Sequence, residues 1–212
     1  MRMFVAVVPP PAAVDHLEDF LAPRQEATPD FRWTSTEQWH LTLAFLPRVQ
    51  DRALDDLTDR LERAAQRRAP VELAIAGGGA FPDPARAKVL FAAIDASPQH
   101  DSTGDADLTD GTGAGNDSGE QELRRLATGA RAAASTAGVE VDGGRFRPHL
   151  TLARTGRPIE ATRWLRVLDA YRGPLWRTTE IALVESHLGE GPRRRPRYEV
   201  RAVFPLGRER AP

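Results

Sequence analysis

The hydrophobic pattern of the chain alternates between short apolar runs and segments with apolar residues at helical spacing. Apolar runs bounded by turn residues predict strands, and they lie at 3–8, 31–33, 71–77, 87–95, 176–188 and 197–206. Segments whose apolar residues recur every three or four positions predict helices, and they lie at 12–22, 51–67, 120–138 and near 160–171. Several strand pairs are joined by short turns, such as "GGGAFPDPAR" at 77–86. Long parallel βαβ periodicity is absent, so the pattern predicts an α+β fold with antiparallel or mixed sheets.

One polar-apolar tetrapeptide, "HLTL", occurs twice, at 40–43 and at 149–152. The chain has only five histidines, and two of them lie in these copies. On a strand, successive side chains point to opposite faces. His40 and Thr42 therefore share one face, and the two leucines of the copy share the other. We expect the leucines to anchor the strand in the core and the His-Thr pair to face a cleft.

The second copy gives His149 and Thr151 the same arrangement, about 7 Å apart along the backbone. Imidazole exchanges protons near neutral pH, with an unperturbed pKa of about 6.5, and a threonine hydroxyl donates a hydrogen bond to an anion. Two such units around a common centre supply one acid, one base and two hydroxyl donors. That set suits in-line displacement at phosphorus: one histidine activates water and the other protonates the leaving oxygen. The chemistry requires no metal.

A single HLTL strand more often has a structural role, as a half-buried histidine beside a β-favouring threonine. The repetition favours the chemical interpretation. Arg154 follows the second copy but falls out of phase with His149 and Thr151 on an ideal strand. It reaches a bound anion only if the strand bends or ends there. A metal site made by the two His-Thr pairs is disfavoured, because threonine is a poor zinc ligand and no cysteine or paired carboxylate accompanies it.

Charge is unevenly distributed along the chain. The formal net charge is -1, but from Val89 to Glu122 there are eight acidic residues and no Lys or Arg, so the remainder carries -1 - (-8) = +7. A basic cleft would concentrate anionic substrates, although a generally arginine-rich surface explains the excess equally well. Residues 97–119 contain one leucine and no aromatic residue. Such a composition predicts a disordered acidic insertion.

Two features near the motifs allow two interpretations each. Trp39 and Phe45 flank the first copy and could stack on a nucleobase, but core packing is the more common role for such residues. A basic turn before the last strand could follow an RNA backbone or simply be solvated, and its arginines are Arg193, Arg194, Arg195 and Arg197.

Composition bounds the class of protein. The chain has 212 residues, 41% of them hydrophobic, which suits a single domain over 1–212. Without cysteine it has no disulfide, thiolate zinc site or cysteine nucleophile. No apolar run approaches the ~20 residues of a membrane helix, and prolines interrupt the opening "MRMFVAVVPPP" too early for a signal peptide. We therefore expect a cytoplasmic protein that does not bind membranes.

Five segments together resemble the two-histidine (2H) phosphoesterases, and within them the bacterial and archaeal RNA 2′,3′-cyclic phosphodiesterases, also called 2′-5′ RNA ligases. The segments are "MRMFVAVVPP", "FRWTSTEQWHLTLAFLPRV", "RFRPHLTLAR", "RYEVRAVFPLG" and the paired motifs themselves. The resemblance implies a bilobal LigT-like α+β fold in which two pseudo-twofold-related lobes surround a central cleft. It also implies hydrolysis of an RNA-terminal or nucleoside 2′,3′-cyclic phosphate to a 2′-phosphate, with reversible 2′-5′ ligation, by a monomer without a cofactor.

Roles for five residues follow from the same resemblance. His40 corresponds to the proton donor and His149 to the proton acceptor, while Thr42, Thr151 and Arg154 correspond to phosphate-binding residues. Two positions differ, because relatives commonly carry a basic residue and a glycine where this chain has Ala44 and Pro47. Alternative hypotheses are a non-catalytic nucleotide- or RNA-binding module, and a related enzyme acting on another cyclic phosphate or a 2′-5′-linked nucleotide.

Overall fold

Two antiparallel sheets organise the residues that the computed structural model describes, which are 1–25, 31–96, 117–191 and 195–207. The four-stranded sheet has the order β3-β1-β8-β9. Its strands are β1 (Met3–Val7), β3 (Leu41–Leu46), β8 (Glu180–His187) and β9 (Arg197–Pro205). The five-stranded sheet has the order β2-β6-β5-β4-β7. Its strands are β2 (Arg32–Trp33), β4 (Val71–Phe81), β5 (Ala87–Asp95), β6 (His149–Ile159) and β7 (Trp176–Thr178).

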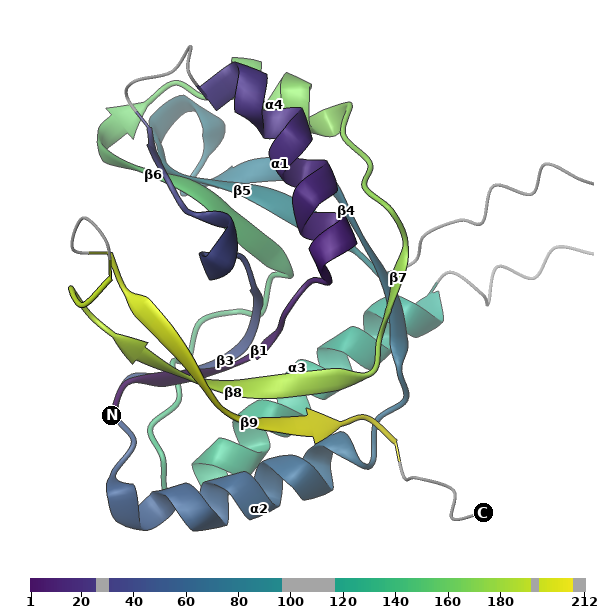
Figure 1. Ribbon diagram of the computed structural model, residues 1–212, viewed down its shortest axis with the longest axis vertical. Coiled ribbons are helices and arrows are strands. Elements are labelled where there is room, and N and C mark those ends of the chain that lie inside the picture. Colours follow the sequence, from purple (N-terminus) through teal and green to yellow (C-terminus); the bar gives the residue numbers. More distant parts are fainter. Residues whose placement is uncertain (26–30, 97–116, 192–194, 208–212) are drawn as a thin grey trace, which may run out of the picture.

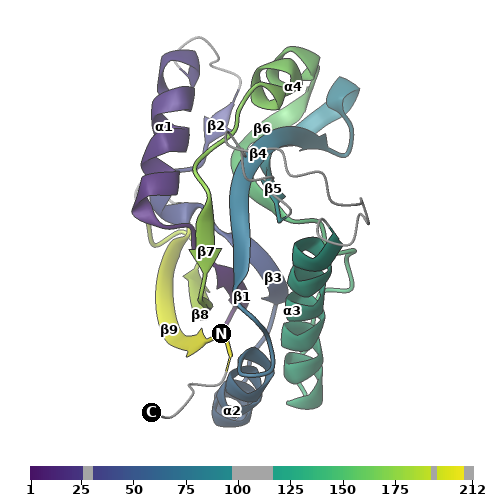
Figure 2. The same cartoon turned by 90° about the vertical axis from the view of Figure 1, so that its right-hand side faces the viewer.

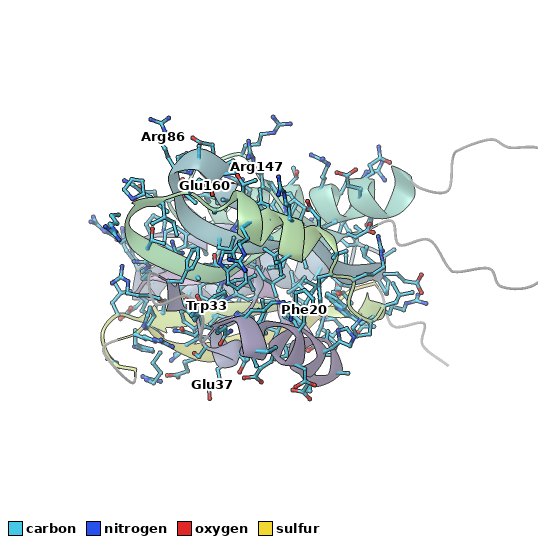
Figure 3. The ribbon with its side chains drawn as sticks, turned by 90° about the horizontal axis from the view of Figure 1, so that it is seen from above. Phe20, Trp33, Glu37, Arg86, Arg147 and Glu160 are labelled. Carbon is cyan, nitrogen blue, oxygen red and sulfur yellow. The ribbon has the colours of Figure 1, made fainter. Side chains whose placement is uncertain are left out.

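Each sheet has two helices on its outer side (Figures 1 and 2). Helices α2 (Leu54–Ala65) and α3 (Asp117–Thr136) accompany the four-stranded sheet, and α1 (Pro11–Gln25) and α4 (Thr162–Asp169) accompany the other. Phe20 of α1, labelled in Figure 3, packs on Tyr171 just after α4, with 4.7 Å between ring centroids. The predicted α+β architecture of two lobes is therefore confirmed.

The leucines of both motifs are buried in one continuous core that spans the two lobes. Leu41 and Leu43 are 1% and 2% exposed, and Leu150 and Leu152 are fully buried. The alternation of faces that the sequence predicted therefore holds through both tetrapeptides. Burial of four leucines fixes which face each strand turns toward the core, and so which face carries the polar side chains.

Two element boundaries differ from the sequence-based prediction. Residues 176–188 do not form one strand: β7 pairs with β4 in one sheet, β8 pairs with β1 in the other, and Thr179 lies between them. A continuous apolar run does not reveal such a change of sheet. Strand β4 also continues to Phe81, so the first half of the predicted turn belongs to a strand. Its glycines leave room for neighbours, since a Cβ at Gly79 would lie 2.3 Å from the ring of Phe91.

Candidate active site

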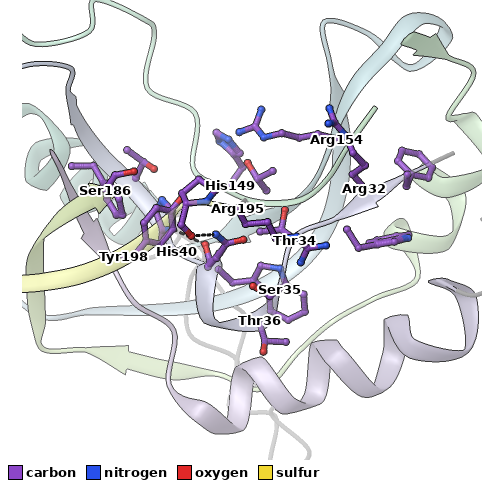
Figure 4. Close-up of a pocket in the computed structure, with 18 of the residues that line it drawn as sticks. Arg32, Thr34, Ser35, Thr36, His40, His149, Arg154, Ser186, Arg195 and Tyr198 are labelled. Carbon is purple, nitrogen blue, oxygen red and sulfur yellow. Dashed lines mark hydrogen bonds between the residues drawn. The ribbon is translucent and has the colours of Figure 1, made fainter. Parts of the chain in front are cut away.

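A cleft of about 1050 Å³ lies between the two sheets and is lined from both lobes (Figure 4). All five residues that the sequence singled out line it, and they are His40, Thr42, His149, Thr151 and Arg154. His40 immediately precedes β3 in the four-stranded sheet, and His149 opens β6 in the five-stranded sheet. The fold thus brings the two HLTL copies together from separate sheets.

A β-bulge follows the threonine in each copy. Strand β3 pairs Thr42 with Ala6 and Ala44 with Val5, which leaves Leu43 as an extra residue. Strand β6 likewise pairs Thr151 with Phe91 and Ala153 with Leu90. A bulge shifts the alternation of faces by one position.

The bulge brings Arg154 into phase with the motif. Its neighbours Leu152 and Ala153 are both buried, and Arg154 then faces the cleft. The corresponding residue in the first copy is Phe45, because the identity of the copies extends through Ala44 and Ala153. Ala44 is buried, at 2% exposed, so position 44 contributes no side chain to the cleft.

Both imidazoles make the same backbone contact. His40 Nδ1 lies 2.7 Å from the Gln38 carbonyl oxygen, and His149 Nδ1 lies 2.7 Å from the Arg147 carbonyl oxygen. A carbonyl only accepts, so each Nδ1 carries the hydrogen and donates it. Nε2 is then left without a proton in the neutral ring and is available for proton transfer. The carbonyl also holds the orientation of each ring.

The surroundings of the two histidines differ. Phe4 stacks on His40 with 4.3 Å between centroids, and Tyr198 meets that ring edge-on at 5.4 Å. His149 instead meets Phe81 and Phe91 edge-on, at 5.1 and 5.2 Å.

These surroundings disfavour the charged imidazolium in both places. The pKa of His40 is lowered to about 4, mainly by burial, with smaller contributions from the charges of His149 and Arg154, while the Gln38 carbonyl opposes the shift. Burial also lowers the pKa of His149, and Arg154 adds to that effect. Both rings are therefore neutral at pH 7 in the ligand-free protein.

Several residues that line the cleft were not found from the sequence, and among them are Arg2, Arg32, Ser186 and Tyr198. Tyr198 lies on β9 directly opposite Ser186 of β8. Burial raises the pKa of the Tyr198 phenol, so its hydroxyl keeps its proton. These side chains come from four different strands or their ends, and only strand pairing places them around the two histidines.

The structure distinguishes between the two interpretations given for the residues beside the motifs and for the basic turn. Trp39 is buried, at 3% exposed, and belongs to the core. Phe45 lines the cleft with the Arg2 guanidinium 4.8 Å from its ring centroid, an arrangement typical of a cation–π contact. Of the basic turn, Arg195 lines the cleft, while Arg197 pairs with Glu190 and Glu199.

Arg193 and Arg194 lie outside the described residues, as do residues 97–116 of the acidic insertion. Across the described ranges, no group of three or more histidine, cysteine or acidic residues is placed to hold a metal ion. None of the described helices is both long and apolar enough to span a membrane.

The site is a cleft with two imidazoles, two threonines and an arginine, contributed by two lobes that repeat one motif. Such a set can supply an acid, a base and hydrogen-bond donors to an anion. A family model described as LigT like Phosphoesterase matches residues 8–91 and 115–193. The chain therefore belongs to the LigT-like phosphoesterase family.

Several curated relatives are RNA 2′,3′-cyclic phosphodiesterases. The Thermus thermophilus protein is 30% identical over 220 residues, covering 100% of this chain and 95% of that protein. The Geobacillus stearothermophilus protein is 26% identical over 205 residues, covering 96% of this chain. The chain spans 56% of the length of that second relative.

Solved structures show the same fold. A crystal structure of a Thermus thermophilus protein matches with a TM-score of 0.68 at 25% identity and covers 99% of this chain and 100% of that one. Escherichia coli LigT without ligand matches with a TM-score of 0.66 at 21% identity and covers 98% of both chains.

Proposed function

We propose that the protein hydrolyses the 2′,3′-cyclic phosphate of an RNA end or a nucleoside to a 2′-phosphate. The observation that carries this proposal is the convergence of His40 and His149 on one cleft from two lobes, each with a threonine on the same face. A single imidazole would suffice for a binding site, whereas displacement at phosphorus uses an acid and a base. The relatives named RNA 2′,3′-cyclic phosphodiesterase support the choice of substrate.

In the proposed reaction, His149 Nε2 accepts a proton from water as the water oxygen attacks phosphorus. The bond between phosphorus and the 3′ oxygen breaks, and His40 donates a proton to that oxygen. The products are a 2′-phosphomonoester and a free 3′-hydroxyl. Thr42, Thr151 and Arg154 hold the phosphate oxygens, since hydroxyl and guanidinium groups both donate to anionic oxygen. If a 5′-hydroxyl attacked phosphorus in place of water, it would give its proton to His149, and the same 3′ oxygen would leave with a proton from His40. The product would be a 2′-5′ linkage with a free 3′-hydroxyl.

For His40 to act as the acid, substrate binding must favour its protonated form, which the free protein disfavours. His40 acts as an acid only when it is protonated, yet its pKa is about 4 without ligand. The negative charge of a bound phosphate favours the imidazolium and raises the pKa of both rings. A proton therefore enters the site together with the anion.

The direct test is incubation with adenosine 2′,3′-cyclic phosphate in the presence of EDTA, followed by identification of the product. We expect adenosine 2′-phosphate, and we expect EDTA to leave the rate unchanged. A 3′-phosphate product would reverse the proposed leaving group. An absence of turnover with both cyclic nucleotides and cyclic-ended RNA would favour a binding module instead. Escherichia coli LigT has been solved with 3′-AMP, so adenosine monophosphates are suitable ligands for a parallel binding measurement.

A further inference from the structure

Two arginines face each other beside the histidines, and no acidic side chain in the described part of the chain pairs with either. Arg32 of β2 lies directly opposite Arg154 of β6. Residues directly opposite on antiparallel strands point to the same face, and both side chains line the cleft, where Figure 4 shows them close together. Among the described residues, neither side chain makes an ion pair or a hydrogen bond. Like charges placed opposite each other destabilise a sheet, so the pair is suited to an anion.

The position of this pair relative to the reacting phosphate is set by β6. His149, Thr151 and Arg154 form one row on the cleft face, with about 7 Å for each two residues of strand. Arg154 is near enough to lower the pKa of both imidazoles. Arg32 belongs to β2, the edge strand beside β6. The pair therefore extends the phosphate site away from the histidines.

The cleft has room and charge for more than one phosphate. Its volume of about 1050 Å³ far exceeds the space of a single phosphate group. Arg2 and Arg195 also line it, and Glu18 is the one carboxylate among the described lining residues. In a ribonucleotide at an RNA end, the group that bears the next negative charge is the phosphodiester on the 5′ side.

We propose that Arg32 and Arg154 together bind the phosphodiester on the 5′ side of the terminal nucleotide, so that the enzyme selects RNA ends over free nucleoside cyclic phosphates. This inference rests on the proposed function and names the substrate class of the same site. A guanidinium presents its donors in a planar fork that matches phosphate oxygens. An anion between the two forks also removes their mutual repulsion. Arg154 spans both phosphates, whereas Arg32 serves the outer one.

The test compares two substrates that differ in one charge: adenosine 2′,3′-cyclic phosphate, and the same compound carrying a 5′-methyl phosphodiester. We expect kcat/KM to be about tenfold to a hundredfold higher for the phosphodiester, the range of a charge-assisted hydrogen bond. Arg32→Ala should remove most of that preference, and Arg32→Lys, which retains the charge, should restore part of it. Arg177→Ala is the matched control, because Arg177 is exposed on β7 of the same sheet and does not line the cleft.

The salt dependence of binding gives a second test, because loss of a purely structural role of Arg32 would not change the difference in salt dependence between the two substrates. Affinity for single-stranded nucleic acid falls as salt rises, and each phosphate contact makes the slope of log affinity against log salt steeper by about 0.7. Affinity for the phosphodiester should therefore fall more steeply with salt than affinity for the nucleoside. Arg32→Ala should remove that difference. Equal kcat/KM for the two substrates, or an equal loss on both in Arg32→Ala, would overturn the inference.

Failure of the proposed function is distinguishable from failure of this inference. If neither substrate is hydrolysed, the proposed function fails, and binding then decides the inference. Adenosine 2′-phosphate with and without a 5′-methyl phosphodiester is titrated by calorimetry into the wild type, Arg32→Ala and Arg177→Ala. Tighter binding of the diester in the wild type and in Arg177→Ala, but not in Arg32→Ala, supports the site. Equal affinities in the wild type reject it.

Discussion

At the scale of residues, the two histidines share a backbone contact and differ in their neighbours. His40 and His149 each donate from Nδ1 to the carbonyl two residues earlier, so both present Nε2 in the same tautomer. Only His40 has a stacked phenylalanine and a tyrosine edge. Only the second motif continues to an arginine, Arg154. The site is therefore built from one repeated unit with unequal halves, which suits an acid and a base.

Removal of either imidazole should abolish useful turnover. We expect His40→Ala and His149→Ala each to lower kcat for a cyclic phosphate by about 10²- to 10⁴-fold, the usual contribution of one proton transfer. Thermal unfolding and circular dichroism would show that both variants keep their fold. Near wild-type activity in either variant would contradict the acid-base assignment.

The pH dependence of the reaction should reflect the burial of both rings. In the free protein burial lowers both pKa values, that of His40 to about 4. Because kcat/KM reports the free enzyme, we expect a bell whose alkaline limb lies below pH 6.5. Bound phosphate raises the two pKa values, so the bell for kcat should lie at higher pH. An alkaline limb of kcat/KM above pH 6.5 would contradict the lowering of both pKa values in the free protein.

At the scale of elements, each motif strand has an apolar face in the core and a polar face that lines the cleft. Leu150 is fully buried, whereas its neighbour Thr151 lines the cleft. The bulge after the threonine then carries Arg154 onto the cleft face. Substitutions at adjacent residues of one strand should therefore affect different properties: the buried residue the stability, and the cleft residue the activity.

Substitution of these two neighbours tests the separation. Leu150→Ala should lower the free energy of unfolding by about 2–5 kcal/mol, as for a large-to-small change in a core. Thr151→Ala should change the stability little and raise the activation free energy by about 1–3 kcal/mol, the value of a hydrogen bond to a charged group. Chemical denaturation and steady-state kinetics measure the two effects. A stability loss in Thr151→Ala as large as that in Leu150→Ala would show that the threonine is structural.

At the scale of the whole molecule, the family pattern is interrupted where the acidic insertion occurs. The family model matches 8–91 and 115–193, so it passes over most of 97–119. All five candidate site residues lie within the matched ranges. Ala96, before the insertion, and Gly119, at its end, lie next to each other, because a Cβ on Gly119 would lie 1.9 Å from the Ala96 carbonyl oxygen. A short linker can therefore replace the intervening residues.

Replacement of 97–116 by a short Gly-Ser linker should leave kcat/KM for adenosine 2′,3′-cyclic phosphate unchanged at physiological ionic strength. Exposed charges separated by more than about 8 Å are largely screened there. The measurement is repeated at low salt, where a screening role for the acidic residues would appear as a faster deletion variant. Loss of activity at both salt concentrations would show that the insertion contributes to the site.

Much of the fold could be read from the hydrophobic pattern, because strand alternation and helical spacing are local properties. The pattern placed Leu41, Leu43, Leu150 and Leu152 in the core, where they lie. It failed at 176–188, since a change of sheet at Thr179 leaves the apolar run uninterrupted. It also missed Arg32, whose importance depends on which residue of another strand lies opposite.

The sequence by itself determined the chemistry that is available: two imidazoles and two hydroxyls, each pair on one face of a strand whose other face is apolar. Strand periodicity enforces that division wherever the leucines are buried. Only the tertiary structure decided that the two pairs face one cleft, that a bulge turns Arg154 toward it, and that Arg32 and Tyr198 join it. It also decided the pKa values of the histidines, because burial and neighbouring charge are properties of the assembled lobes. The repeated HLTL motif specifies the parts of the site, and the pairing of distant strands specifies its geometry.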